Sequence, residues 1–212
     1  MDFSYEGFYA RFDTPSKKEG SLLMGADNIV GNDYTVEFKT EEGRVVAWLS
    51  NKFGAEIGYL DVDGSRKLQL ANARNMEMRV MLSFVAYSDT PDPGLYWGEV
   101  AVICFNPAYA TEMNAFADRV SRRLADGVRP ALSFGSTAVK KIQEEPGWMP
   151  SETVPFPKKE KGMAVLKSSQ SLSEKMVEQG RARNKGCYAV SVLFIAVVVI
   201  VFVLGIVGLL NR

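Results

Sequence analysis

Alternation of hydrophobic and polar residues dominates the first hundred positions and predicts β-strands. Tyr34, Val36 and Phe38 alternate with polar neighbours, which is typical of a half-buried strand. Further strands are predicted at 45–49, 57–60, 76–87 and 95–105, and the turn-forming residues 88–94 predict a hairpin between the last two. In the strand at 76–87 we expect a single face to carry Met76, Met78, Val80, Leu82, Phe84 and Ala86.

Helical spacing begins in the middle of the chain. One helix is predicted over 65–75, with Ser65 as its N-cap. A second begins at Asn106 and Pro107, which suit an N-cap and the first helical position, and ends at Gly127. A short third helix is predicted over 136–145. The expected fold class is α+β: a small antiparallel β-barrel or strongly bent sheet with two or three helices.

Proline and charge divide the rest of the chain. Residues 146–162 contain four prolines, which is typical of an extended linker, and 168–180 could form a marginal helix. We therefore expect a cytosolic β-rich domain at 1–145, a Pro-rich and then basic juxtamembrane linker at 146–186, a transmembrane helix at 187–210 and a tail at 211–212.

The predicted transmembrane segment rests on length and charge. Residues 188–210 read YAVSVLFIAVVVIVFVLGIVGLL and contain no charged side chain. As a helix they would extend about 35 Å, enough to cross a hydrocarbon core of about 30 Å. The high Val and Ile content would suit a strand in water, but an isolated segment in lipid must satisfy its own backbone hydrogen bonds. A buried core helix is the alternative, and we expect that to be shorter and interrupted by polar residues.

Flanking charges orient this segment. Five basic residues precede it and only Arg212 follows it, a bias that places the N-terminal part in the cytoplasm. No signal-peptide pattern occurs at the N-terminus, so the layout is that of a tail-anchored, single-pass protein. We expect Cys104 and Cys187 to be thiols in this reducing compartment. Cys187, at the membrane boundary, is a candidate for acylation or simply a small apolar residue.

The chain has a net charge of zero, but its charged residues are distributed unevenly along the sequence. Residues 1–150 carry 16 basic and 21 acidic residues, a net charge of −5, whereas residues 151–212 carry 9 and 4, a net charge of +5. A basic juxtamembrane stretch favours contact with an anionic leaflet. The acidic N-terminal part opposes the electrostatic attraction on which nucleic-acid binding depends.

Signals for catalysis are sparse. The chain has no histidine, which excludes His-based acid–base catalysis and His-ligated metal sites. Cys104 lies in an apolar run and is predicted to be a buried, inert thiol. Asp89, Asp92 and Glu99 flank a turn, but their spacing matches no calcium loop and favours a solvated turn. We therefore predict no catalytic residues, no metal and no cofactor; an enzyme that uses only carboxylates and lysines is the remaining alternative.

Aromatic and basic residues provide the candidate binding site. Trp48, Tyr59 and Trp97 lie on predicted strands, and Lys52, Arg66 and Lys67 lie close to them in sequence. Aromatic side chains beside cations can stack nucleobases and hold phosphates. The alternative is that the aromatic residues belong to the core and the basic residues to a solvated helix face.

Residues 25–89 resemble a divergent HIRAN domain, a small β-barrel module. The resemblance rests on the Asn-containing loop Ala26-Asp27-Asn28 before a strand, on Ile57-Gly58-Tyr59-Leu60, and on the short helix and long strand that follow. It implies a β-barrel fold and binding of the 3′ end of single-stranded DNA, with Asn28, Asn32 and Tyr59 at matching positions. Where the family has an aromatic–Asp pair, this chain has Gly31 and Asn32.

Two hypotheses for function follow. The first is a non-enzymatic module, tethered to the lipid bilayer, whose cytoplasmic domain recruits an unknown protein partner. The second is a HIRAN-like, single-stranded nucleic-acid-binding domain tethered to the same membrane. A vesicle-fusion SNARE is rejected because the segment before residue 187 is too short for a heptad helix and contains Gly180.

Overall fold

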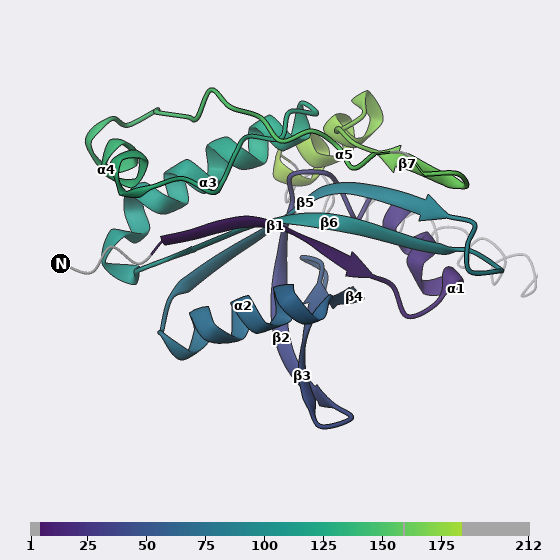
Figure 1. Ribbon diagram of the computed structural model, residues 1–212. Helices are drawn as coiled ribbons and strands as arrows, with labels where there is room; N and C mark the ends of the chain where they lie inside the picture. Colours follow the sequence, from purple (N-terminus) through teal and green to yellow (C-terminus); the bar gives the residue numbers. More distant parts are fainter. Residues whose placement is uncertain (1–4, 159, 184–212) are drawn as a thin grey trace, which may run out of the picture. The chain divides into compact units, whose positions relative to one another are not determined.

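The computed structural model describes residues 5–158 and 160–183 and divides the chain into two units, 1–170 and 171–212. This part of the chain has seven strands and five α-helices (Figure 1). The strands are β1 (Tyr5–Asp13), β2 (Asp33–Glu41), β3 (Arg44–Ser50), β4 (Glu56–Leu60), β5 (Glu77–Ser88), β6 (Leu95–Phe105) and β7 (Met163–Lys167). The helices are α1 (Lys17–Gly20), α2 (Val62–Ala73), α3 (Ala110–Ala125), α4 (Ser136–Glu144) and α5 (Leu172–Arg183), with 3₁₀ turns η1 (Ser21–Met24) and η2 (Pro107–Tyr109). Helix α5 belongs to the second unit.

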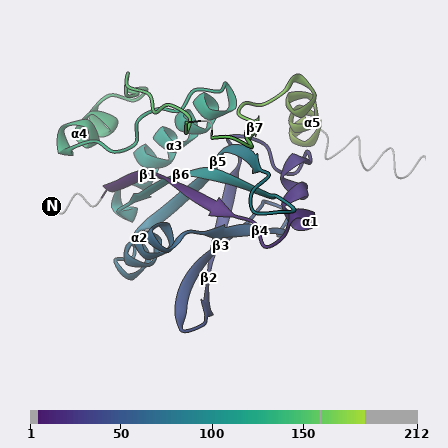
Figure 2. The ribbon, with the colours of Figure 1, turned by 45° about the vertical axis from the view of Figure 1, so that its right-hand side comes forward.

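All seven strands form one antiparallel sheet, which confirms the predicted α+β class. Their order is β2-β3-β4-β1-β6-β5-β7. An additional pairing of Asp33 and Tyr34 with Met81 and Val80 joins β2 back to β5, so the first six strands form a hydrogen-bonded ring. Helices α2 and α3 lie on opposite sides of β1 and β6 (Figures 1 and 2). The core is dominated by side chains between these layers, including Phe12, Leu49, Leu68, Leu82 and Phe116.

A β-bulge in β5 overturns the predicted single face of that strand. Pairing with β6 shifts register between Leu82 and Phe84, so one extra residue is inserted. Because side chains alternate along a strand, this insertion moves Phe84 and Ala86 to the face opposite Val80 and Leu82. Phe84 and Ala86 pack with Trp97 in a second, smaller hydrophobic cluster.

The two longer predicted helices form, with one corrected start. Helix α2 begins at Val62, three residues before the predicted cap Ser65, because Asp61 caps it by accepting a hydrogen bond from the Gly64 N–H at 2.7 Å. At the start of α3, Asn106 accepts from the Ala108 N–H as predicted, although the first turn is the 3₁₀ turn η2. The face of α3 that packs against β5 and β6 carries Met113, Phe116, Ala117, Val120 and Leu124.

The Pro-rich segment is part of the folded unit and does not behave as the linker expected from residue 146. The Val154 N–H donates to the Arg129 carbonyl at 2.8 Å, and the ring of Phe156 lies 5.6 Å from that of Phe84. Beyond it, β7 adds to the edge of β5, and the first unit ends at Gln170. Local proline content could not show that the segment packs against distant residues.

No helix within residues 5–158 and 160–183 is long and apolar enough to cross a bilayer. The predicted transmembrane helix at 187–210, the tail at 211–212 and Cys187 lie outside the described residues.

Candidate binding face

The strands β2, β3 and β4 present one face to solvent, opposite the face that buries Ala47 and Leu49. Strand register determines its members, because residues directly opposite each other in an antiparallel pair point to the same side. Trp48 lies opposite both Glu37 and Tyr59, and Lys39 lies opposite Val46. We call this set the outer β2–β4 face: Glu37, Lys39, Glu41, Arg44, Val46, Trp48 and Tyr59.

A turn at the tip of the β2–β3 hairpin fixes this register. Glu42 and Gly43 have φ angles of 48° and 77°, which are the left-handed values of a two-residue type I′ turn. Gly43 adopts that conformation without a steric penalty from a Cβ. The hairpin extends beyond the neighbouring strands (Figure 1). The turn therefore places Glu41 opposite Arg44 and, further along, Glu37 opposite Trp48.

An aromatic pair lies at the centre of the outer β2–β4 face. The ring centroids of Trp48 and Tyr59 are 5.3 Å apart, and both side chains are half-buried. The Lys39 ammonium lies 4.7 Å from the Trp48 ring, and the Trp48 Nε1–H donates to Glu41 at 2.6 Å. Lys39 also pairs with Glu56, and this hydrogen bond is the main reason that the pKa of Lys39 is raised. Groups of both charges thus surround an aromatic platform.

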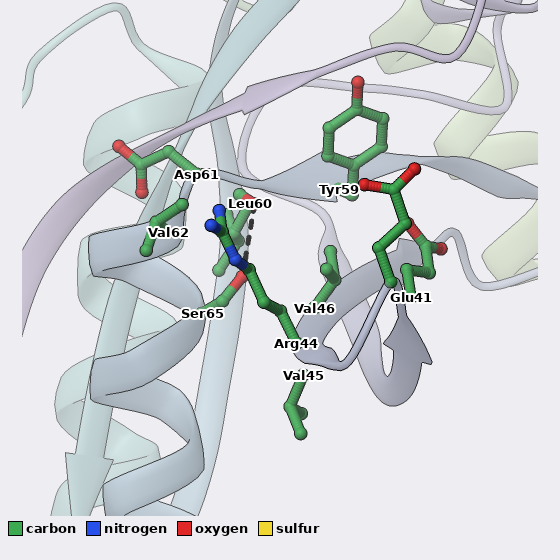
Figure 3. A pocket seen from close by; sticks show the side chains of 10 residues that line it. Glu41, Arg44, Val45, Val46, Tyr59, Leu60, Asp61, Val62 and Ser65 are labelled. Carbon is green, nitrogen blue, oxygen red and sulfur yellow. Dashed lines mark hydrogen bonds between the residues drawn. The ribbon is translucent and has the colours of Figure 1, made fainter.

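A cavity of about 480 Å³ adjoins this pair on the side of α2 (Figure 3). In this view Arg44 lies in the middle of the lining residues, with Glu41 and Tyr59 to one side and Asp61 and Val62 to the other. The Ser65 hydroxyl joins α2 to β4 and β3 beside the cavity. It donates to the Leu60 carbonyl at 3.1 Å and accepts from the Ala47 N–H at 3.1 Å. Cationic, anionic and apolar groups together suit a peptide with side chains of mixed character.

The structure brings together only part of the predicted binding site. Trp48 and Tyr59 are adjacent, and a platform on which bases stack requires such an arrangement. Lys52 lies over the ring of Phe53 in the β3–β4 turn, at 5.5 Å. Arg66 is exposed on α2, and the Lys67 ammonium lies 4.6 Å from the ring of Phe8.

Three predicted site residues have structural roles. Asn28 is 2% exposed; its amide donates to the Leu22 carbonyl and accepts from Tyr34 and Asn51. The Asn32 carbonyl accepts from the Leu82 N–H at 3.0 Å, which attaches its loop to β5. Trp97 is 5% exposed, and its indole N–H donates to Ser88 at 3.0 Å. The side chains of Asn28 and Trp97 are therefore buried, and they make hydrogen bonds within the fold.

Lys39, Glu41 and Arg44 are members of the face that sequence reasoning missed. The signal was present in the Glu42-Gly43 pair, because a two-residue turn determines which residues lie opposite each other in the hairpin. Counting back from that turn places Lys39 and Glu41 on the same side as Trp48.

An internal ion pair lies in a different part of the fold and corrects the expectation that Glu99 belongs to a solvated turn. Arg129, 3% exposed on its side chain, pairs with Glu99 on β6. Its guanidinium also donates to the Ser83 hydroxyl at 3.1 Å and to the Pro155 carbonyl at 2.6 Å. Burial raises the pKa of Glu99, and the charge of Arg129 partly offsets that rise. These contacts join β5, β6 and the Pro-rich segment, a structural role.

Cys104 is a free, fully buried thiol, as predicted, and burial raises its pKa to about 12. Such a thiol is protonated at neutral pH and is a poor nucleophile. Among residues 5–158 and 160–183, no group of three or more Cys, Asp or Glu side chains is arranged to hold a metal ion.

Comparison with known proteins finds no matching family model, no similar curated protein and no similar solved structure.

Proposed function

We propose that this chain is a single-pass membrane protein whose cytoplasmic α+β domain is a non-enzymatic binding module, and that the outer β2–β4 face recruits a protein partner. The observation that carries the proposal is the Trp48–Tyr59 pair beside a cavity lined by groups of both charges. Half-buried aromatic side chains offer a large contact area at a low cost in side-chain entropy, and they are enriched at the energetic centres of interfaces.

The membrane part of the proposal rests on sequence. Residues 188–210 are uncharged and long enough to cross a bilayer, and the basic residues that precede them favour a cytoplasmic N-terminal domain. A recruiting module needs a tether and a recognition surface, and the chain offers a candidate for each. The same arrangement accounts for the acidic N-terminal part, which an anionic leaflet would repel.

We expect a Trp48→Ala variant to lose partner capture at least tenfold, because removal of a central aromatic anchor typically costs about 2–4 kcal/mol of binding free energy. Full-length protein in detergent would capture proteins from a cytosolic extract, and each captured protein would be quantified by mass spectrometry. Phe53→Ala is the matched control: Phe53 is another aromatic residue, 54% exposed, that lies in the β3–β4 turn and is not a member of the outer β2–β4 face. If the two variants retain the same proteins in the same amounts, the outer β2–β4 face is not the docking surface.

The second candidate is a HIRAN-like, single-stranded nucleic-acid-binding domain, and one observation favours it. The ammonium of Lys39 above the ring of Trp48, beside Tyr59, resembles a platform on which a base could stack near a cation. The nucleic-acid hypothesis is weakened by the carboxylates of Glu37 and Glu41 and by the net charge of −5 over residues 1–150.

A titration with single-stranded oligonucleotide separates the two functions. Under the leading proposal, we expect Trp fluorescence of the full-length protein to show no binding below the millimolar range at 50 mM salt. Binding in the micromolar range that weakens steeply as salt rises would instead support the nucleic-acid function, since phosphate contacts release counterions. Trp48→Ala would then abolish the fluorescence change.

A further inference from the structure

Strand β2 pairs with β3 from Thr35 to its last residue, and it pairs with β5 only at its start. Its pairing with β3 covers Thr35 to Glu41, whereas its pairing with β5 covers only Asp33 and Tyr34. No strand within the described residues pairs with the second edge of β2 from Thr35 to Glu41. Such an edge is a template for an additional strand.

The hairpin geometry identifies the residues that present their backbone groups at this edge. A two-residue turn is closed by a hydrogen-bonded pair, here Glu41 and Arg44, and such pairs alternate with non-hydrogen-bonded pairs along an antiparallel ladder. Val36, Phe38 and Thr40 therefore direct their N–H and C=O groups away from β3. An independent contact agrees: Ala47, opposite Phe38, donates its N–H to Ser65 instead of to β2.

The charges along β2 make this edge complementary to itself. Glu37 is exposed, and the Lys39 side chain is 32% exposed on the same face. If two copies pair antiparallel with Phe38 opposite Phe38, Glu37 of each copy lies opposite Lys39 of the other. Val36 then lies opposite Thr40 of the second copy, and the three opposed pairs supply about six hydrogen bonds.

The same charges disfavour the two neighbouring registers of this strand pair. A shift that brings Val36 opposite Phe38 places Glu37 opposite Glu37 of the second copy. A shift that brings Phe38 opposite Thr40 places Lys39 opposite Lys39. Like charges directly opposite each other destabilise a strand pair, so only the register centred on Phe38 is favoured.

We propose that this protein forms a two-fold symmetric dimer in which the β2 edges of two copies pair antiparallel, centred on Phe38. A symmetric interface uses the same patch on both copies, and the β2 edge meets that condition through its alternating charges. A cavity of about 490 Å³, lined by Thr35, Val36 and Arg79 among others, adjoins the start of the free edge and gives the hairpin tip of the second copy room to approach. The dimer joins two outer β2–β4 faces into one continuous surface.

A charge-swap experiment tests the dimer. Full-length copies with two different affinity tags would be mixed in detergent, and the fraction captured together would be measured. We expect the wild type to capture itself, whereas Glu37→Lys and Lys39→Glu each lose self-capture at least tenfold, because each opposes like charges in both pairs. When Glu37→Lys is mixed with Lys39→Glu, every opposed pair is again of opposite charge, and capture returns.

Recovery in the mixture also controls for folding, because two misfolded variants would not restore each other. Thr40→Pro supplies a second probe: it removes an N–H that points away from β3, and it should weaken self-capture relative to Thr40→Ala. A wild type that does not capture itself overturns the dimer. So does self-capture by both single variants at the wild-type level, which would locate the association elsewhere in the chain.

Discussion

An Arg129→Met variant is expected to be about 3–5 kcal/mol less stable than the wild type, the cost of breaking a buried ion pair by removal of one partner. The side chain of Glu99 is 16% exposed, so the change leaves a largely desolvated carboxylate without its cation. Ser83 and the Pro155 carbonyl also lose a charged donor. Methionine fills similar volume, so the loss reports on the polar contacts more than on a cavity.

The measurement is urea unfolding of the full-length protein in detergent, followed by Trp fluorescence. Arg66→Met is the matched control, because Arg66 is exposed on α2 and its loss should change stability by less than about 0.5 kcal/mol. A second change isolates the cause. Arg129→Met combined with Glu99→Gln removes the orphaned charge, so the double variant should be more stable than Arg129→Met alone. Equal stability of the two would show that the orphaned carboxylate is not the cause.

The same variant has a pH dependence of known sign. The pKa of Glu99 is raised by burial in the folded protein, and loss of Arg129 removes the contact that opposes the rise. A carboxyl whose pKa is higher in the folded state than in the unfolded state makes the protein more stable as the pH falls. The gain occurs between the folded-state pKa and the unfolded-state pKa, which is about 4.3. The stability deficit of Arg129→Met relative to wild type should therefore narrow as the pH is lowered from 7 toward 5.

Two arginines in place of Val199 and Ile200 are expected to release most of the protein from membranes. Both residues lie near the middle of the uncharged segment 188–210, where an arginine costs about 2.5–3.5 kcal/mol of insertion free energy. The wild type should remain in the membrane pellet after alkaline carbonate extraction, and the variant should appear in the supernatant. Val199→Leu with Ile200→Leu is the matched control, since it keeps the segment apolar.

Protease added outside sealed cells gives the orientation of the same protein. We expect the N-terminal domain to be protected, because the basic residues before the segment favour the cytoplasmic side. A wild type that carbonate removes from membranes would falsify the anchor, and a domain digested from outside the cell would reverse its orientation.

Most strands could be predicted from sequence because each depends on a local pattern, either alternation or a short apolar run next to turn residues. The predicted strand at 95–105 has the bounds of β6, and the hairpin to β5 forms where Pro and Gly indicated a turn. The predicted face of β5 was wrong beyond Leu82, because a bulge depends on pairing with β6 and not on the composition of β5 itself. The Pro-rich segment was similarly underestimated, since its contacts are with residues more than twenty positions away.

Part of the candidate site could likewise be predicted from sequence, and part could not. Trp48 and Tyr59 could be identified as aromatic residues on strands, and the turn at Glu42-Gly43 contains the information that places Trp48 on the same face as Lys39 and Glu41. The burial of Trp97 and Asn28 could not be predicted. Trp97 belongs to a cluster that packs with Phe156, Met163 and Val165, which are distant in sequence. Residue type alone does not distinguish a buried tryptophan from an exposed one.

Composition and local patterns were enough to establish the absence of histidine chemistry, the charge asymmetry, the apolar segment at 188–210 and the antiparallel character of the sheet. These properties depend on composition and on patterns a few residues long. Long-range pairing sets which face of β5 holds Phe84, brings Arg129 to Glu99, and leaves one edge of β2 without a partner strand among the described residues. Each of these depends on pairing between distant residues, which local patterns do not encode.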